Sequence, residues 1–469
     1  MGHWLGKIFA RQSAAPPPGN QFYVDPAGGA TNPGAIGSPW TLPVALAGGY
    51  PTNTVQPGDT IFLRGGTYTG LFTNSLNGAF LNPITVRHYP GERPIIDCNN
   101  GTDPGAIGYA LYLQDGVCSY TNFIGLEITN SLTNRWNATS GSNPADARNR
   151  GVFCNATEQN VINCFVHDTG QGIESWQKAH NSILYGNIIC WNGWNAPDRE
   201  HGHGTYINNF EGGSSKTIKH NIYTDVLPVS GSSECQNIQA YGSSGSGFNN
   251  SLVTENILAN GEVIIGGAAG FDMAGTSATN NISLGGFVFG YHGLYNNPTW
   301  VTGNSFVNLG ASSCFAAPYD TTTGRVGYTM TGNLLVGDLD GFSSSDYPTN
   351  TYYAKASPPA SPNQVYVFPN QYEANRAYIA IHNWQGLSSV AVDLSSAVAN
   401  GTAINIWNAQ DYLGTLVYSG TYGGGTVSIP MTGMTVGTPV GLGVPGNYQV
   451  AVTSTGPEFG EFIVRQQGA

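Results

Sequence analysis

The sequence predicts an all-β protein in which a right-handed parallel β-helix is followed by a small C-terminal β-sandwich. Three observations predict this fold class. Short strand-like segments that share an asparagine recur about every two dozen residues, no helical apolar pattern of any length separates them, and glycine is abundant (65 of 469 residues) while only 9% of residues are charged. Because 40% of residues are hydrophobic and 11% aromatic, the chain can build a core beneath a coat of amides and hydroxyls.

The repeat is the strongest of these signals. Successive shared asparagines are 24, 34, 35, 25, 23 and 29 residues apart, which predicts a basic coil of about two dozen residues, lengthened in places by loops. An asparagine tolerates a left-handed backbone at a tight bend, and its amide can bond to the equivalent amide of the next coil. We therefore expect a ladder through Asn163, Asn187, Asn221, Asn256, Asn281, Asn304 and Asn333. The apolar residues that flank it, Ile, Val, Leu and Phe, are expected inside a narrow core.

The N-terminal segments carry a family resemblance. Phe22-Tyr-Val-Asp-Pro, then Pro39-Trp-Thr-Leu-Pro-Val-Ala-Leu, then Pro57-Gly-Asp-Thr-Ile-Phe-Leu-Arg-Gly-Gly-Thr-Tyr resemble the cap and first coil of pectate-lyase-like β-helix proteins. The resemblance covers Gln21 to about Ala354 and implies a fold rather than an activity. It also implies that Trp40–Ala47 form a short helix that covers the open end of the core.

Composition divides the chain into four parts. Residues 1–20 are expected to be a tail or leader remnant, residues 21–355 the β-helix, residues 356–363 a linker stiffened by three prolines, and residues 364–469 the sandwich. The last part resembles the small β-sandwiches appended to carbohydrate-active enzymes. Glycan binding, capping of the helix end and dimerisation are its alternative roles.

Charge and cysteine usage limit the partners. A formal net charge of −12 argues against nucleic acid as a partner, and no apolar run is long enough to span a bilayer. We expect a secreted or cell-surface protein, although no complete signal peptide is visible in the sequence. The cysteine number, seven, is odd; Cys98 and Cys118 are candidates for a bridge, whereas Cys154, Cys164 and Cys190 fit as small buried residues.

The two longest intervals between asparagines locate a candidate site. They flank Asn221 and contain the string Asp198-Arg-Glu-His-Gly-His-Gly-Thr-Tyr-Ile-Asn. Aligning the coils makes residues 172–176, 204–208 and 237–241 equivalent strands, with Ile173, Thr205 and Ile238 pointing inward. The outward residues then form two rows, a credible platform for sugars. The first row is Glu174, Tyr206 and Gln239, the second is Trp176, Asn208 and Tyr241, and Trp191 and Trp194 are expected to form a wall beside them.

Five residues are candidates for catalysis: Glu174, His201, His203, Tyr206 and Asp168. His201 and His203 alternate, so in an extended segment they share one face and could act as acid and base or hold a metal together with Asp198 or Glu200. Their alternative role is to brace the loop, and Asp168 is equally consistent with a turn residue. No cofactor is certain from the sequence; a divalent cation such as calcium is one alternative.

Three functions remain open for a polysaccharide-binding chain of unknown oligomeric state. In β-elimination on a uronic-acid polymer, His201, His203 and Tyr206 supply base and acid, while Lys178, Arg199 or calcium neutralises the substrate carboxylate. In hydrolysis, Glu174 pairs with Asp168, Asp198, Glu200 or Glu234. The third function is a non-catalytic glycan-binding or spike protein. The histidines and tyrosine favour the lyase, whereas the acidic composition and the scarcity of nearby cations weigh against it.

Overall fold

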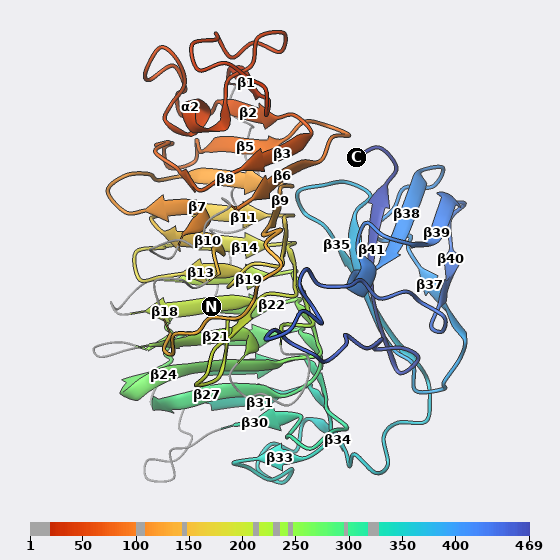
Figure 1. Cartoon of the computed structure of the whole chain (residues 1–469). Coiled ribbons are helices and arrows are strands. Elements are labelled where there is room, and N and C mark those ends of the chain that lie inside the picture. The colour runs from red at the N-terminus through yellow and green to blue at the C-terminus, as the bar shows by residue number, and fades with distance from the viewer. Residues whose placement is uncertain are drawn as a thin grey trace.

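The computed structural model describes residues 19–99, 108–142, 148–209, 215–227, 235–242, 247–294, 299–317 and 328–469. Up to about residue 353 the chain winds into stacked coils whose strands form three long parallel sheets (Figure 1). Each regular coil contributes one strand to each sheet in turn, so neighbours within a sheet come from successive coils. The predicted β-helix is thereby confirmed.

Sheet 1 contains eleven strands among the described residues. Its inward side chains alternate with outward ones, as Ile61 and Leu63 are fully buried while Thr60 and Phe62 are partly exposed. In order across the sheet the strands are β1 (Gln21–Val24), β2 (Thr60–Leu63), β5 (Ile84–His88), β8 (Thr121–Ile124), β11 (Gln159–Ile162), β14 (Ser182–Tyr185), β19 (Lys216–Lys219), β22 (Leu252–Thr254), β25 (Ser277–Thr279), β28 (Thr299–Thr302) and β31 (Tyr328–Thr331).

Sheet 2 follows sheet 1 in each coil after one bend. Its described strands are β3 (Gly66–Thr69), β6 (Pro94–Asp97), β9 (Glu127–Thr129), β12 (Phe165–His167), β15 (Ile188–Cys190), β20 (Ile222–Thr224), β23 (Ile257–Ala259), β26 (Ile282–Leu284), β29 (Ser305–Val307), β32 (Leu334–Val336) and β34 (Thr351–Tyr353).

Sheet 3 completes each coil. Its described strands are β4 (Phe72–Thr73), β7 (Tyr109–Gln114), β10 (Arg150–Asn155), β13 (Ile173–Ser175), β18 (Thr205–Asn209), β21 (Gln236–Gly242), β24 (Glu262–Asp272), β27 (Phe287–Leu294), β30 (Phe315–Ala316) and β33 (Leu339–Asp340). Several of the connections next to it lie outside the described residues.

A short helix covers the N-terminal end of the core. Helix α2 (Leu42–Leu46) buries Leu42, Ala45 and Leu46, and the neighbouring Trp40 is fully buried against Phe22. This is the capping helix predicted over Trp40–Ala47. It removes from water the apolar side chains that the first coil would otherwise leave exposed.

The asparagine ladder runs along the bend between sheets 1 and 2. From Asn187 to Asn350, each side-chain Nδ2 donates to Oδ1 of the asparagine one coil further on, at 2.7 to 3.0 Å. The same Oδ1 accepts the backbone N–H of the preceding asparagine at 2.8 to 3.1 Å. Since these amides are buried, the ladder satisfies groups that would otherwise destabilise the bend.

The ladder differs from the prediction at both ends. Strand pairing aligns Leu184 with Val161 and Tyr185 with Ile162, so Cys164, and not Asn163, stands level with Asn187. Asn163 instead bonds with Asn370 of the C-terminal region at 3.2 Å. At the other end the ladder continues to Asn350, only 17 residues beyond Asn333.

The left-handed residue of the bend is also not the ladder asparagine. It is the residue before it, with φ between 55° and 70° at Gly186, His220, Glu255, Asn280, Gly303 and Gly332. The asparagine is therefore selected for its amide, whereas the backbone requirement falls on its neighbour.

The C-terminal region, residues 364–469, contains two antiparallel sheets that enclose one apolar core. The larger sheet has the order β35 (Gln364–Pro369), β36 (Ala377–His382), β41 (Phe459–Gln466), β38 (Ala403–Asn408) and β39 (Leu416–Thr421); the smaller pairs β37 (Ser389–Asp393) with β40 (Thr426–Pro430), and a 3-10 turn, η2 (Ala409–Asp411), follows β38.

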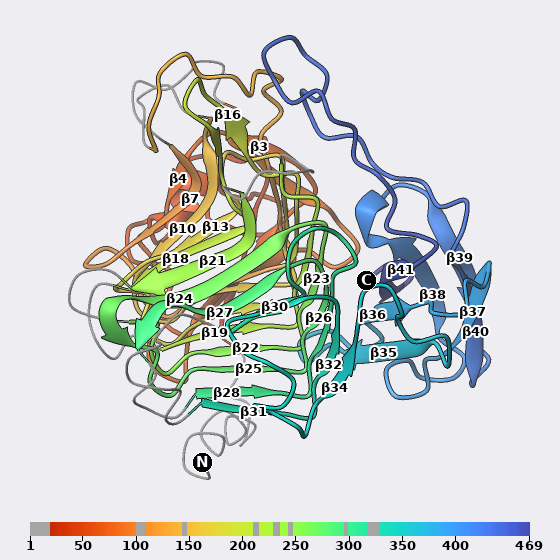
Figure 2. The same cartoon turned by 90° about the horizontal axis from the view of Figure 1, so that it is seen from below.

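The C-terminal region packs against the outer face of sheet 2 (Figures 1 and 2). Successive strands of that sheet carry five apolar side chains in register: Phe165, Ile188, Ile222, Ile257 and Ile282. All five are buried in one cluster with Tyr378, Ala380, Phe459 and Ile463 of the larger C-terminal sheet. The prediction that these isoleucines point into the coil is wrong, because the residues that follow Asn187, Asn221, Asn256 and Asn281 face outward and are covered by the C-terminal region.

All seven cysteines are buried free thiols, so the predicted bridge between Cys98 and Cys118 is wrong. Cys164 and Cys190 lie in apolar clusters, in keeping with small buried side chains. Within the part of the chain that the structure describes, no helix is long and apolar enough to cross a membrane.

Candidate functional site

The outer face of sheet 3 carries the residues that the sequence brought together. Strand pairing sets Ile173 level with Thr205 and Ile238, and Glu174 level with Tyr206 and Gln239. The first three are fully buried in the interior of the coil, as predicted. The predicted register of these three strands is confirmed, and it places the outward row on one face.

Glu174 lies at the centre of this face and is completely buried. Its carboxylate receives a charged hydrogen bond from Arg150 Nη1 at 2.5 Å, another from the indole Nε1 of Trp176 at 2.9 Å, and a longer one from the Tyr109 hydroxyl at 3.4 Å. Although burial by itself lowers the pKa of Arg150, the carboxylate of Glu174 holds that pKa above its ordinary value. The two residues therefore form a fixed, buried ion pair.

An aromatic stripe crosses this face on strands β7, β10, β13 and β18. The ring centroids of Tyr112 and Phe153 are 5.1 Å apart and nearly parallel, those of Phe153 and Trp176 are 6.0 Å apart, and those of Trp176 and Tyr206 are 6.3 Å apart. Three inter-strand spacings make the stripe about 14 Å long. Tyr112 and Phe153 thus stack on one another, whereas the planes of the other two pairs are tilted by 49° and 57°.

His203 extends the stripe, with its ring 5.3 Å from that of Tyr206 and only 11° from parallel. Its Nδ1 accepts the backbone N–H of Gln236 at 3.1 Å. Burial, followed by the charge of Arg150, lowers the pKa of His203 to about 3. The imidazole is therefore neutral at ordinary pH with its proton on Nε2, which makes it a hydrogen-bond donor rather than a base.

His201 has different surroundings. Its ring stacks on Trp194 at 4.0 Å and 7°, and its Nε2 lies 3.3 Å from Asp198 Oδ1. It belongs to a two-residue strand, β17 (Glu200–His201), that pairs with β16 (Trp194–Asn195). The extended segment assumed for the two histidines ends at Gly202, whose φ is 99°, so they do not share the face of one strand.

Nowhere in the described ranges do three or more His, Cys, Asp or Glu residues gather as metal ligands. Asp198 is engaged by Arg199 Nη1 at 3.1 Å as well as by His201. The cation considered from the sequence therefore has no preformed cage among these side chains and stays a prediction.

The remaining sugar-binding candidates lie around the stripe to different degrees. Asn208 is outward but almost fully buried, and its Oδ1 has no hydrogen-bond partner among the described residues. Lys178 and Gln239 are half-buried, and the backbone of Lys178 donates to Asn155 Oδ1 at 3.0 Å. Arg199 is 38% exposed. Tyr241 pairs with Asn208 through its backbone, and its side chain is outside the described residues.

Two candidates lie in the seam between the coils and the C-terminal region. Asp168 is buried, 2.5 Å from Arg135 Nη2 and 2.7 Å from His167 Nδ1, and it accepts the backbone N–H of Val440 at 2.8 Å. Trp191 packs in the apolar cluster that the C-terminal region covers. Both positions connect layers of the fold, and any catalytic or binding role for them stays a prediction.

Arg150 and Tyr109 are the site residues that sequence reasoning missed. Both belong to coils before the first recurring asparagine, so the alignment of coils did not reach them. The available signal was Arg150 itself, a charged residue at the start of the apolar run Arg150-Gly-Val-Phe-Cys. Glu234, one of the proposed hydrolytic partners of Glu174, lies outside the described residues.

Comparison with known proteins identifies the coil region. Residues 22–225 match the family described as Pel9A-like, right handed beta helix region. The chain resembles this family over less than half of its length, and its fold is a right-handed parallel β-helix. The match ends within the coil of β20, so it includes sheet 3 as far as β18 and omits the C-terminal region. No curated protein matches the sequence.

Several solved structures are similar to this chain at low identity. An alginate lyase from Paenibacillus sp. str. FPU-7 is 16% identical over 71% of this chain and 98% of its own, with a TM-score of 0.40. XylC in complex with xylose is 10% identical over 94% of this chain and 100% of its own, with a TM-score of 0.43. Pectate lyase Pel9A is 16% identical over 71% of this chain and 80% of its own, with a TM-score of 0.34.

Proposed function

We propose that this chain is an extracellular polysaccharide-degrading enzyme that holds a glycan along the aromatic stripe and cleaves it by β-elimination beside a uronate carboxylate. The observation that carries the proposal is the buried Arg150–Glu174 pair set among the rings of Phe153, Trp176 and Tyr206. The family whose pattern matches residues 22–225 takes its name from Pel9A, itself described as a pectate lyase.

The rings and the charged pair have separate tasks in this scheme. The stripe stacks against sugar faces, while the buried Arg150–Glu174 pair, whose charges compensate each other, fixes the side chains beneath it. Glu174 receives three donors, which suits an anchor that fixes Arg150 and Trp176 better than an acid that gives up a proton. Arg199 and Lys178 are the further cations available to a polyanionic substrate.

The elimination step needs a proton removed from C5 of the uronate, formation of the C4–C5 double bond, breakage of the C4–O bond and a proton for the leaving oxygen. Neutral His203 can donate a hydrogen bond from Nε2 to the substrate carboxylate, which stabilises the charge that develops there. In this scheme Tyr206, stacked on His203, takes the C5 proton as the phenolate and returns a proton to the leaving oxygen as the phenol.

The activity test uses pectate, alginate and a neutral xylan, with ultraviolet absorbance and new reducing ends recorded in parallel. Elimination gives both signals, because each cleavage leaves an unsaturated uronate. Reducing ends without absorbance would show hydrolysis instead, and neither signal on this panel would leave a glycan-binding protein. Repeating the assay with a chelator shows whether calcium takes part.

The residue test compares two phenols on one stripe. Tyr206→Phe is expected to lower turnover at least a hundredfold while glycan binding persists, as general acid–base groups contribute about 10²–10⁴-fold. The matched control is Tyr112→Phe, whose hydroxyl donates to Gln114 Oε1 at 3.0 Å and takes no part in the scheme. Equal turnover in both variants would remove Tyr206 from the mechanism.

A further inference from the structure

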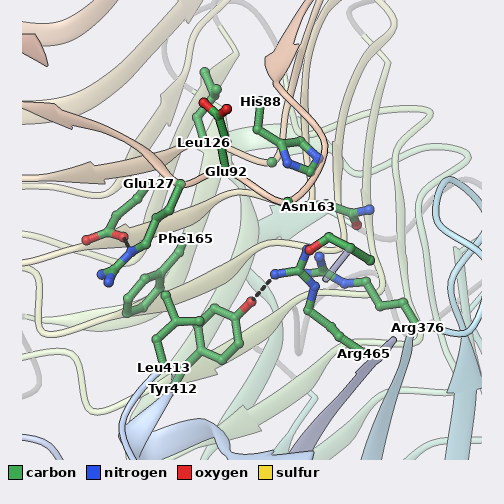
Figure 3. Close-up of a pocket in the computed structure, with 14 residues that line it drawn as sticks. His88, Glu92, Leu126, Glu127, Asn163, Phe165, Arg376, Tyr412, Leu413 and Arg465 are labelled. Atoms are coloured by element: carbon green, nitrogen blue, oxygen red, sulfur yellow. Dashed lines mark hydrogen bonds and ion pairs between the residues drawn. The ribbon is translucent and has the colours of Figure 1, made fainter. Parts of the chain in front are cut away.

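A pocket of about 130 Å³ lies between the Pel9A-like coils and the C-terminal region (Figure 3). Its lining comes from β5, from the bend before β9, from β12, and from three separate parts of the C-terminal region. A single water molecule needs about 10–15 Å³ on the same measure, so the pocket has room for a small ligand. It belongs to the sheet 2 side of the coil and contains none of the residues of the aromatic stripe.

One wall of the pocket is apolar. The rings of Phe165 and Tyr412 meet edge to face with centroids 5.1 Å apart, and Leu126 and Leu413 complete this wall. Figure 3 shows the two rings and Leu413 on one side, with Arg376 and Arg465 beside them. A ligand held here therefore needs a compact carbon body as well as a polar end.

The other wall carries more cations than carboxylates. Glu373, next to the pocket, is shared by Arg376 Nη1 at 3.0 Å and Arg465 Nε at 3.1 Å. Burial alone would raise the pKa of Glu373, yet the two guanidinium groups lower it to about 2. Two positive charges thus face one negative charge.

On the opposite side, the charges of Arg93 and His167 are matched by Glu127 and Asp168. Glu127 lies between Arg93 Nε and His167 Nε2, the latter at 3.3 Å. Burial by itself lowers the pKa of His167, but Asp168 and Glu127 raise it to about 9, so at neutral pH the imidazole is charged. The remaining lining carboxylate, Glu92, is neutralised by Arg64.

The pKa of His88 reflects the charges around the pocket. It lines the pocket and is nearly buried, and its pKa is lowered to about 4 by burial first and then by Arg87 and Arg465. Its imidazole is therefore neutral at pH 7 in a positive environment. Arg376 Nε, in addition, is buried without a hydrogen-bond partner among the described residues, and Arg465 donates from Nη1 to the Tyr412 hydroxyl at 3.2 Å and from Nη2 to the backbone oxygen of Ala469 at 2.7 Å.

We propose that this pocket binds a small organic carboxylate, with its carbon body against Phe165 and Tyr412 and its carboxylate toward Arg465. A free organic acid and the terminal uronate of a glycan chain share this chemistry. The site is separate from the aromatic stripe, so binding here does not depend on the reaction proposed above.

The test is calorimetric titration of the full chain at pH 7 with acetate, galacturonate, glucose and inorganic phosphate. Acetate and galacturonate are expected to bind, and glucose is not. Tighter binding of galacturonate identifies the sugar acid as the preferred source of the carboxylate, and equal binding identifies free acids. Absence of heat with both carboxylates, or tighter binding of phosphate than of either, overturns the proposal.

Two variants locate the ligand. Arg465→Gln removes the facing charge and Leu413→Trp fills the apolar side, and each is expected to weaken carboxylate binding at least about tenfold, as loss of a charged hydrogen bond or of the space would. Lys355→Gln, which removes a surface cation paired with Asp338, is the control and should bind as the wild type does. Folding is checked by thermal unfolding, and Leu413→Trp keeps the test valid if Arg465→Gln unfolds.

The imidazole of His88 gives a second readout that requires no variant. A bound carboxylate adds negative charge beside the ring, so the pKa of His88 should rise in a nuclear magnetic resonance titration with saturating acetate. Unchanged affinity in both folded pocket variants, together with an unmoved His88 titration, would place any carboxylate binding elsewhere and refute the assignment.

Discussion

The outer faces of sheets 2 and 3 are built on the same coils but carry side chains of different polarity. Sheet 2 presents one phenylalanine and four isoleucines in register, all buried beneath the C-terminal region. Sheet 3 presents Tyr112, Phe153, Glu174, Tyr206 and Gln239 in its corresponding row. One row is aliphatic and covered, whereas the other is aromatic or polar and only partly covered.

This difference separates stability from chemistry. Burial of each isoleucine contributes about 1.5–3 kcal/mol to the free energy of unfolding. Left uncovered, a row of this kind would be an exposed apolar patch that promotes association. Rings with polar edges carry no such penalty, so sheet 3 can stay accessible to a glycan. Both faces belong to the same coils, and the apolar face is the one that the C-terminal region covers.

The largest expected effect concerns the buried Arg150–Glu174 pair on sheet 3. Arg150→Met leaves the carboxylate of Glu174 uncompensated, and loss of one partner of a buried pair costs about 3–5 kcal/mol of unfolding free energy. The variant is also expected to lose turnover. Chemical denaturation and the pectate assay measure the two effects.

The double variant Arg150→Met/Glu174→Gln sharpens this test. Removing both charges should restore much of the lost stability without restoring turnover. If the single variant were as stable as the wild type, Arg150 and Glu174 would not form the buried pair described above.

Ile222→Ala tests the covered face. The side chain is fully buried between β20 and the C-terminal region, so its truncation should cost about 2–5 kcal/mol, with Ile222→Val costing about 0.5–1.5 kcal/mol as a graded control. Turnover at a temperature where the variants remain folded should be unchanged. A loss of turnover without a loss of stability would contradict the division between the two faces.

His167 makes the seam sensitive to pH. Folding raises its pKa from 6.5 to about 9 through Asp168 and Glu127, against the effect of burial. The folded state therefore holds the proton more tightly: this stabilisation is complete below about pH 6.5 and is lost as pH rises through about 9, by up to about 3 kcal/mol. His167→Gln should flatten the unfolding free energy between pH 7 and pH 9, and an equally steep profile in the variant would assign the titration to another group.

The smallest expected effect lies at the end of the aromatic stripe. Tyr112 is half-buried, and its ring stacks on Phe153. Tyr112→Leu should change unfolding free energy by less than about 1 kcal/mol and raise KM about three- to tenfold with kcat unchanged, as expected for one aromatic contact. An unchanged KM would mean that the glycan does not reach β7.

The sequence predicts the regular part of this fold because the ladder obeys strict chemistry. A buried amide that must bond to the coils on both sides leaves few substitutes, so Asn187 to Asn333 are legible in the sequence. The prediction of the ladder fails at Asn163, where an asparagine fills the neighbouring left-handed position. It also misses Asn350, whose coil is unusually short. Spacing alone cannot distinguish two adjacent asparagine-tolerant positions.

The site residues can be predicted from the sequence only in the coils that contain a recurring asparagine. The register of Glu174, Tyr206 and Gln239 follows from period-two alternation counted from a fixed asparagine. Arg150 and Tyr109 lie in coils without that reference, and their contact with Glu174 depends on pairing between distant segments. The protonation of His203 depends on a backbone donor from the next coil, which no sequence pattern encodes.

The row of isoleucines under the C-terminal region also constrains how the protein can evolve. Solenoid proteins lengthen by duplicating a coil, and each added coil displaces every coil beyond it by about 4.8 Å. A turn inserted between β12 and β26 would pull matched isoleucines away from β36 and β41, whereas one inserted before β5 would only lift the cap formed by α2. The middle of the molecule is therefore fixed in length by its second layer, and variation in size among descendants of this sequence should accumulate at the N-terminal end.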